Sequence, residues 1–185
     1  MSTTTPQTRP PNAPRKSSRK LPQEPSPDHG VPLIFQRDIC FGCGPANSSG
    51  LQLNFAVAQD GNSCICEFSL ADRFVGPPGH AHGGIIATIL DEAMSKANRL
   101  KTRKLNGKVA LTRHIRVEYL RPVPLGQQLV VQGRVSRMSG RALYTSAELC
   151  NAKGLLLARG RGKFLAVDAE KMFARELENE RSAAT

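Results

Sequence analysis

Aromatic residues are scarce in this chain of 185 residues: it has no tryptophan, and aromatic side chains make up 5% of it. Modules that bind single-stranded nucleic acid stack bases on such side chains, and few are present here. Long apolar runs are also missing, since the longest are as short as those at 84–87 and 155–158. A membrane-spanning helix needs about 20 apolar residues. We therefore expect a soluble protein with no membrane partner.

Acidic residues are outnumbered by basic ones, with 15 Asp and Glu against 26 Lys and Arg and a net charge of +11. Most of the surplus lies in residues 96–163, which hold 16 basic and two acidic residues. The positive side chains are either a solvated surface or partners for the phosphates of a ligand. Nucleic acid is not the expected partner, because no recognised binding motif accompanies the charge.

Five cysteines occur, at positions 40, 43, 64, 66 and 150. An odd count without a secretory signal fits a reducing compartment, so we expect a cytoplasmic protein. Cys40, Cys43, Cys64 and Cys66 could form a four-thiolate zinc site. The alternative is that they are small buried apolar residues.

Composition divides the chain into three parts. Residues 1–30 contain seven prolines and no apolar periodicity, so we expect a disordered basic tail rich in Pro, Ser and Thr. Residues 31–167 have the patterning of one folded domain. Residues 168–185 read as a charged C-terminal helix and tail, with Asp168 as the N-cap.

The apolar patterning of 31–167 predicts an α+β fold. Alternation over 51–58 and 64–70 around an Asp-Gly-Asn turn predicts a hairpin. Helical spacing follows from Gly83 or Gly84 onward, and four strand-like runs come next, near 109–120, 127–138, 141–150 and 155–166. We expect an antiparallel sheet wrapped around one long helix.

The start of the predicted helix carries the candidate chemistry. Gly83 and Gly84 would leave backbone N–H groups open to an oxyanion, although close helix packing is an equal explanation for two glycines. Asp91 lies with Gly84, Thr88 and Ser95 on a strip of small residues, where a ligand can reach it. The neighbouring Glu92 lies instead on a charged strip with Lys96 and Arg99.

Distance along the helix restricts how these groups can cooperate. Gly83 and Asp91 are eight residues apart, which corresponds to about 12 Å. A carbonyl bound by the glycine N–H and a base acting on the attacking water must both lie within about 3 Å of the reacting atoms. If both groups are catalytic, Asp91 must come from another subunit.

Three segments together resemble the hotdog-fold acyl-CoA thioesterases, in particular the branch similar to the phenylacetate-pathway thioesterases. They are Cys40-Phe41-Gly42-Cys43-Gly44-Pro45-Ala46-Asn47-Ser48-Ser49-Gly50-Leu51, Gly76-Pro77-Pro78-Gly79-His80-Ala81-His82-Gly83-Gly84 followed by Asp91, and Tyr119-Leu120-Arg121-Pro122-Val123-Pro124-Leu125-Gly126. The resemblance covers roughly residues 31–166.

The resemblance implies a hotdog fold and hydrolysis of an acyl-CoA in a homodimer or dimer of dimers, with sites at the interface. In the family the glycine after the histidine polarises the thioester carbonyl, a role that falls on Gly83. The partner's acid acts as general base or nucleophile, which falls on Asp91, and a strand Ser or Thr orients water, which falls on Thr112. Some relatives also use Asn or Gln where this chain has Gly76.

Substrate contacts are expected from His82, Gly84 and Ser95, and from Arg141 on the phosphates of coenzyme A. The resemblance implies no metal and no cofactor, and it favours metal-free cysteines. His80 and His82 could be a ligand pair, but the chain has only four histidines.

Two other functions remain open. One is a hotdog dehydratase, which the spacing of His82 and Asp91 disfavours. The other is a non-catalytic protein that binds acyl-CoA or, through its charge, nucleic acid.

Overall fold

The computed structural model describes residues 39–102 and 108–183. The expected tail over 1–30, and the first eight residues of the expected domain, lie outside this range. The division of the chain into three parts therefore stays a prediction.

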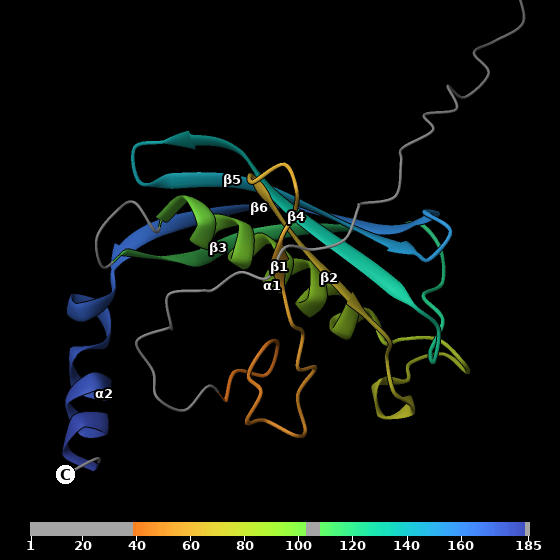
Figure 1. Ribbon diagram of the computed structural model, residues 1–185, viewed down its shortest axis with the longest axis horizontal. Helices are drawn as coiled ribbons and strands as arrows, with labels where there is room; N and C mark the ends of the chain where they lie inside the picture. The colour runs from red at the N-terminus through yellow and green to blue at the C-terminus, as the bar shows by residue number, and fades with distance from the viewer. Residues whose placement is uncertain (1–38, 103–107, 184–185) are drawn as a thin grey trace, which may run out of the picture.

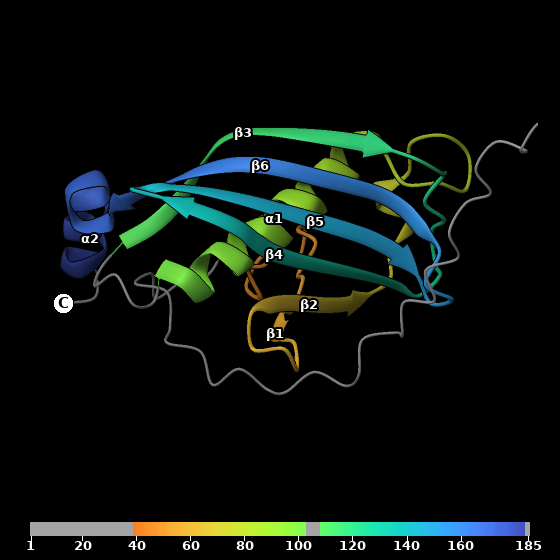
Figure 2. The same cartoon turned by 90° about the horizontal axis from the view of Figure 1, so that it is seen from above.

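One antiparallel sheet of six strands dominates the described chain, in the order β1-β2-β4-β5-β6-β3. The strands are β1 (Ala56–Val57), β2 (Ser63–Phe68), β3 (Lys108–Tyr119), β4 (Leu129–Ser139), β5 (Ala142–Asn151) and β6 (Leu156–Asp168). The helices are the 3-10 turn η1 (Asp72–Phe74), α1 (Gly83–Thr102) and α2 (Ala169–Ala183). Figures 1 and 2 show α1 lying across one face of the sheet and α2 beyond one end of it.

The predicted α+β architecture is confirmed, and it is the architecture of the hotdog fold. The helix starts at Gly83 as expected. Its apolar stripe is 5% exposed or less at every position and packs into the core against the sheet: Ile86, Ile89, Leu90, Ala93, Met94 and Ala97. The four later strands begin and end within three residues of the predicted bounds.

The predicted hairpin is present, but its first strand is only two residues long. β1 pairs with β2 across the expected turn, where the Asp60 carboxylate accepts the N–H groups of Asn62 and Ser63, each at 2.9 Å. The residues before β1 pair with a loop: Leu51 and Leu53 donate their N–H groups to the carbonyls of Phe41 and Gly42. The alternation of 51–55 therefore reflects packing under a loop and not pairing in the sheet.

Close packing of α1 on β4 depends on Gly133. A Cβ at this position would lie 2.1 Å from the carbonyl oxygen of Ala93, far inside van der Waals contact. The helix and sheet therefore approach backbone to backbone, which fixes the position of α1 and of the polar side chains it carries. Among the described residues, no helix is both long and apolar enough to cross a membrane.

Candidate active site

The loop before α1 is held by backbone hydrogen bonds on both sides. Ala81 donates its N–H to the carbonyl of Val123 at 2.9 Å, and His82 donates to Phe74 at 2.9 Å. A Cβ at Gly76 would lie 2.7 Å from the Cα of His82, so this position has no room for a side chain. The Asn or Gln of some relatives is therefore excluded here by the loop's own backbone.

One N–H at the start of α1 has no partner among the residues that the structure describes. The first-turn N–H groups of a helix have no acceptor inside it. His82 satisfies three of them: its carbonyl accepts from Ile85 at 3.0 Å and Ile86 at 3.1 Å, and its Nδ1 accepts from Gly84 at 3.0 Å. Within the described part of the chain, the Gly83 N–H makes no hydrogen bond. An oxyanion could bind there, at the positive end of the helix dipole.

Tyr119 is a site residue that the sequence analysis assigned no role. Its hydroxyl donates to the Gly83 carbonyl at 3.1 Å, so the end of β3 is tied to the start of α1. A Cβ at Gly83 would meet the Tyr119 ring at 3.7 Å, which is ordinary contact. The position of Tyr119 in the quoted strand-end motif was the one available signal.

Asp91 lies two turns further along α1 and is half-buried. The Thr112 hydroxyl, on β3, donates to Asp91 Oδ1 at 3.0 Å. Burial raises the pKa of Asp91 above its ordinary value, and the charge of Glu92 adds to this, while the Thr112 hydrogen bond acts in the opposite direction. A carboxylate whose pKa is raised above its ordinary value suits a general base.

Of the remaining predicted site residues, Ser95 lies near Asp91 and Arg141 lies elsewhere. Ser95 is half-buried, one turn beyond Asp91 on α1. Arg141 is exposed in the β4–β5 turn. The next residue, Ala142, pairs with Leu165 of β6, which pairs with Leu111 of β3, so Arg141 lies two strands from Thr112 and not beside Gly83. The structure thus brings Asp91 and Thr112 together, and it leaves Gly83 and Arg141 apart from them within one chain.

The loop with Cys40 and Cys43 covers Glu92, contrary to the expectation of a solvated charged strip. The side chains of Glu92 and Lys96 are only 15% and 18% exposed. Lys96 Nζ lies 3.4 Å from Glu92 Oε1 and 3.0 Å from Cys43 Sγ. Burial and Glu92 raise the pKa of the Cys43 thiol. A helix periodicity alone could not reveal this covering loop.

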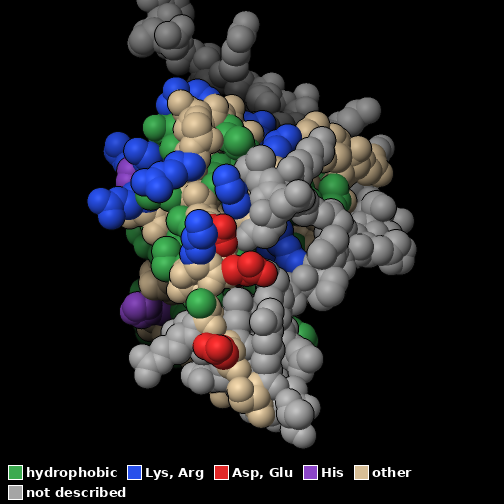
Figure 3. Space-filling view, turned by 90° about the vertical axis from the view of Figure 1, so that its left-hand side faces the viewer, with side chains coloured by type: hydrophobic (Ala, Val, Ile, Leu, Met, Phe, Trp, Pro, Cys, Tyr) green, Lys and Arg blue, Asp and Glu red, His purple; other side chains and the backbone are tan. Residues whose placement is uncertain are grey.

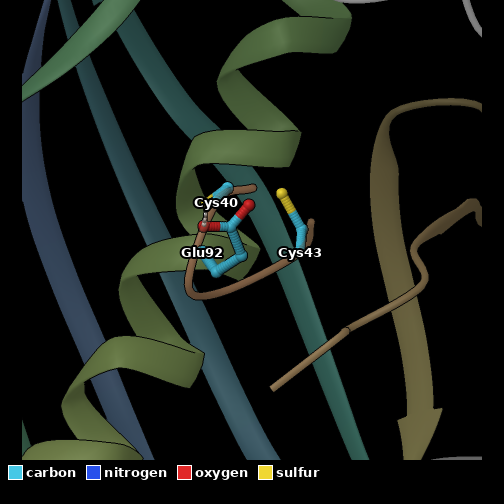
Figure 4. Close-up of side chains that lie close together, drawn as sticks. All are labelled: Cys40, Cys43 and Glu92. Carbon is cyan, nitrogen blue, oxygen red and sulfur yellow. Dashed lines mark hydrogen bonds between the residues drawn. The ribbon is translucent and has the colours of Figure 1, made fainter. Parts of the chain in front are cut away.

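Cys40, Cys43 and Glu92 are the described residues that gather like metal ligands, with ligand atoms within 4.8 Å of one another (Figure 4). The four-thiolate arrangement is not the one formed, since Cys64 Sγ instead lies 3.1 Å from the carbonyl oxygen of Ala93. Because the Lys96 ammonium already pairs with both Cys43 and Glu92, we read the cluster as the contact that holds this loop on α1.

Comparison with known proteins places the chain. A profile of the Thioesterase superfamily matches residues 78–158, from the loop before α1 into β6. Acyl-coenzyme A thioesterase 13 of Homo sapiens is 30% identical over 98 residues, which cover 52% of this chain and 68% of that protein. The chain belongs to the thioesterase superfamily.

Other members of the superfamily agree with this placement. Acyl-coenzyme A thioesterase THEM4 of Xenopus laevis is 33% identical over 122 residues, or 65% of this chain and 53% of that protein. The chain thus spans about half the length of this relative. A crystal structure of a thioesterase superfamily protein has a TM-score of 0.59 and 30% identity, covering 66% of this chain and 60% of that one. A phenylacetic acid degradation-related protein from Ralstonia eutropha has a TM-score of 0.56 and 25% identity, covering 65% and 89%.

Proposed function

We propose that this protein hydrolyses acyl-CoA thioesters to a free acid and coenzyme A. The observation that carries the proposal is the pairing of a half-buried carboxylate, Asp91, with the Thr112 hydroxyl, on a helix whose first N–H at Gly83 has no partner within the described chain. The relatives named acyl-coenzyme A thioesterases support the same reaction.

In the proposed reaction the Gly83 N–H donates to the thioester carbonyl oxygen and stabilises the negative charge that develops there. Asp91 takes a proton from water as the water oxygen bonds to the carbonyl carbon. The tetrahedral intermediate then collapses, the carbon–sulfur bond breaks, and the thiolate of coenzyme A leaves with the proton from Asp91. In the alternative route the Asp91 carboxylate attacks the carbonyl carbon directly, the carbon–sulfur bond breaks to release coenzyme A, and water then hydrolyses the acyl-enzyme anhydride to the free acid.

Thr112 keeps the Asp91 carboxylate ionised and fixes its orientation. His82 and Gly84 contribute through the helix cap: Gly84 donates to His82 Nδ1, which leaves the Gly83 N–H as the free donor. Ser95 lines the same strip of α1 next to the acyl group, and Arg141 binds a phosphate of coenzyme A.

A homodimer or dimer of dimers supplies the complete site. Gly83 and Asp91 are about 12 Å apart along α1, too far to act on one carbonyl. β3 is an edge strand of the described sheet and contains Thr112, and Tyr119 at its end is 55% exposed. A sheet edge is a template for pairing with another chain. Pairing of two β3 strands would bring Asp91 of one copy toward Gly83 of the other.

The test is to measure steady-state hydrolysis of short-chain, medium-chain and aromatic acyl-CoAs, with release of the free thiol of coenzyme A as the signal. The wild type is expected to hydrolyse at least one of them, and Asp91→Asn to lose about 10²-fold or more in kcat. Glu92→Gln is the matched control, because Glu92 is the adjacent acid but pairs with Lys96. No hydrolysis across the panel, or an Asp91→Asn variant as active as wild type, would refute the proposal.

A further inference from the structure

Part of the basic surplus of the sequence lies on the face of the sheet that α1 leaves uncovered, which we call the outer face. A Cβ at Gly160 would touch Leu90 and Met94 of α1, so Gly160 faces the helix. Side chains alternate along a strand, so its neighbours Arg159 and Arg161 point to the outer face. Figure 3 shows Lys and Arg side chains gathered in the upper part of one side of the molecule.

The register of the strands sets these cations in rows across the sheet. In the first row, Arg134 of β4 pairs with Ser146 of β5, Ser146 with Arg161 of β6, and Arg161 with Arg116 of β3. Three of its four positions are arginines, and none is acidic. We call these four residues the arginine row.

The adjacent row, Arg137–Tyr144–Lys163–His114, is built around an aromatic ring. The Arg137 guanidinium lies 4.2 Å from the centroid of Tyr144, and Lys163 Nζ lies 5.8 Å from it. The ring orients two further cations at the border of the arginine row.

On the other side of the arginine row the charges alternate and compensate each other. Glu148 pairs with Arg159, and Arg159 pairs with Glu118, whose Oε2 lies 2.6 Å from Arg159 Nη2. By contrast, Arg116, Arg134 and Arg161 form no ion pair within 4.0 Å with the residues that the structure describes, although the charge of Glu118 reaches Arg116 and Arg161 and that of Asp60 reaches Arg134. The alternating charges of Glu148, Arg159 and Glu118, which we call the compensated row, are the arrangement expected of a sheet surface whose only requirement is stability.

Like charges that stand directly opposite on neighbouring strands destabilise a sheet. Arg116 and Arg161 are such a pair, on strands about 4.8 Å apart. The two basic rows, except for Arg137, also line a depression of about 550 Å³ on the outer face, together with Arg159 and Glu148 of the compensated row. That volume is typical of sites for small ligands. A second copy of this face would bring more positive charge, so it is not the fitting occupant.

We propose that this depression binds a compact polyphosphate, either a nucleoside polyphosphate or an inorganic oligophosphate. Arg116, Arg134 and Arg161 hold successive phosphates by charge-assisted hydrogen bonds, and Lys163 lies at the edge of the site beside Tyr144. The depression lies across the sheet from Asp91, so this is a second site and does not depend on the proposed hydrolysis.

The test is calorimetric titration of the full chain with inorganic tripolyphosphate and with ATP at about 0.15 M salt. Saturable binding of both means that the phosphate chain is recognised, and binding of ATP alone means that the nucleoside contributes. Arg161→Gln is expected to weaken binding about tenfold or more, since it removes a charge-assisted bond. Lys153→Gln makes the same change in net charge in the exposed β5–β6 turn and is expected to keep the affinity within about twofold.

Two further measurements separate a ligand site from a merely charged surface. Without ligand, Arg161→Gln is expected to raise the melting temperature, because it relieves the Arg116–Arg161 repulsion, and to leave acyl-CoA hydrolysis unchanged. The proposal is overturned if no saturable binding is found, or if wild type and Arg161→Gln bind with equal affinity. It is also overturned if the protein binds coenzyme A but neither tripolyphosphate nor ATP, or if it binds duplex DNA but not tripolyphosphate.

Discussion

Removing the Thr112 hydroxyl tests how the proposed base is kept ionised. In Thr112→Val the donor that lies 3.0 Å from Asp91 Oδ1 is lost, while the shape of the side chain is kept. That hydrogen bond opposes the burial and the Glu92 charge that raise the pKa of Asp91, so its loss raises this pKa further. A larger fraction of the carboxyl is then protonated at a given pH, and the acid limb of the rate profile moves to higher pH.

The size of the effect follows from the exposure of the pair. A hydrogen bond to a charged group contributes about 1.5–3 kcal/mol, and because Thr112 is exposed we expect the lower end. This corresponds to about a tenfold loss of kcat/KM on the acid limb, with a smaller loss on the plateau. The assay is kcat/KM between about pH 5 and pH 9 with the best acyl-CoA of the panel.

Thr112→Ser is the control, since it keeps the hydroxyl and is expected to keep the acid limb of the wild type. If Thr112→Val and wild type had superimposable profiles, the hydroxyl would have no part in holding Asp91, and the reasoning would be wrong.

Two other predictions concern stability. Because folding raises the pKa of Asp91, the ionised carboxylate destabilises the folded state above that pKa. The free energy of unfolding of Asp91→Asn in urea is therefore expected to be at least equal to that of wild type at pH 7, and any gain should vanish below about pH 4. A marked loss of stability at pH 7 would contradict this. Gly133→Ala is expected to cost about 3 kcal/mol in the same assay, because its Cβ would lie 2.1 Å from the Ala93 carbonyl oxygen. Gly160→Ala, whose Cβ would meet only side-chain atoms at 3.3 Å, should cost less, and equal costs would refute the argument.

The sequence was sufficient for the central helix and the four long strands because their periodicity is the direct result of burial. The stripe from Ile86 to Ala97 faces one sheet, and each long strand has turn residues at its ends. It also singled out Asp91 over Glu92, and the structure pairs Asp91 with Thr112 while Glu92 pairs with Lys96. The resemblance singled out Thr112 as the residue that orients water, whereas its contact with Asp91 was not predicted, since β3 and α1 meet only in three dimensions.

What the sequence could not provide depends on contacts between segments far apart in the chain. Glu92 and Lys96 have the spacing of a solvated strip, yet the loop at Cys43 covers them. The way His82 satisfies the N–H groups next to Gly83 depends on the fold of the loop, and no spacing in the sequence indicates it. The arginine row required the strand register, because its members come from four separate strands.

The central claim, that one site uses Gly83 of one copy and Asp91 of the other, is tested most directly by mixed dimers. Gly83→Pro removes the N–H at the first helical position, where proline is tolerated, and Asp91→Asn removes the base. A dimer with one variant on each chain keeps one intact site, so about half the wild-type activity is expected although each parent is inactive. A dimer of wild type with the double variant is expected to be inactive. The opposite pattern, an inactive first dimer and a half-active second, would contradict the account.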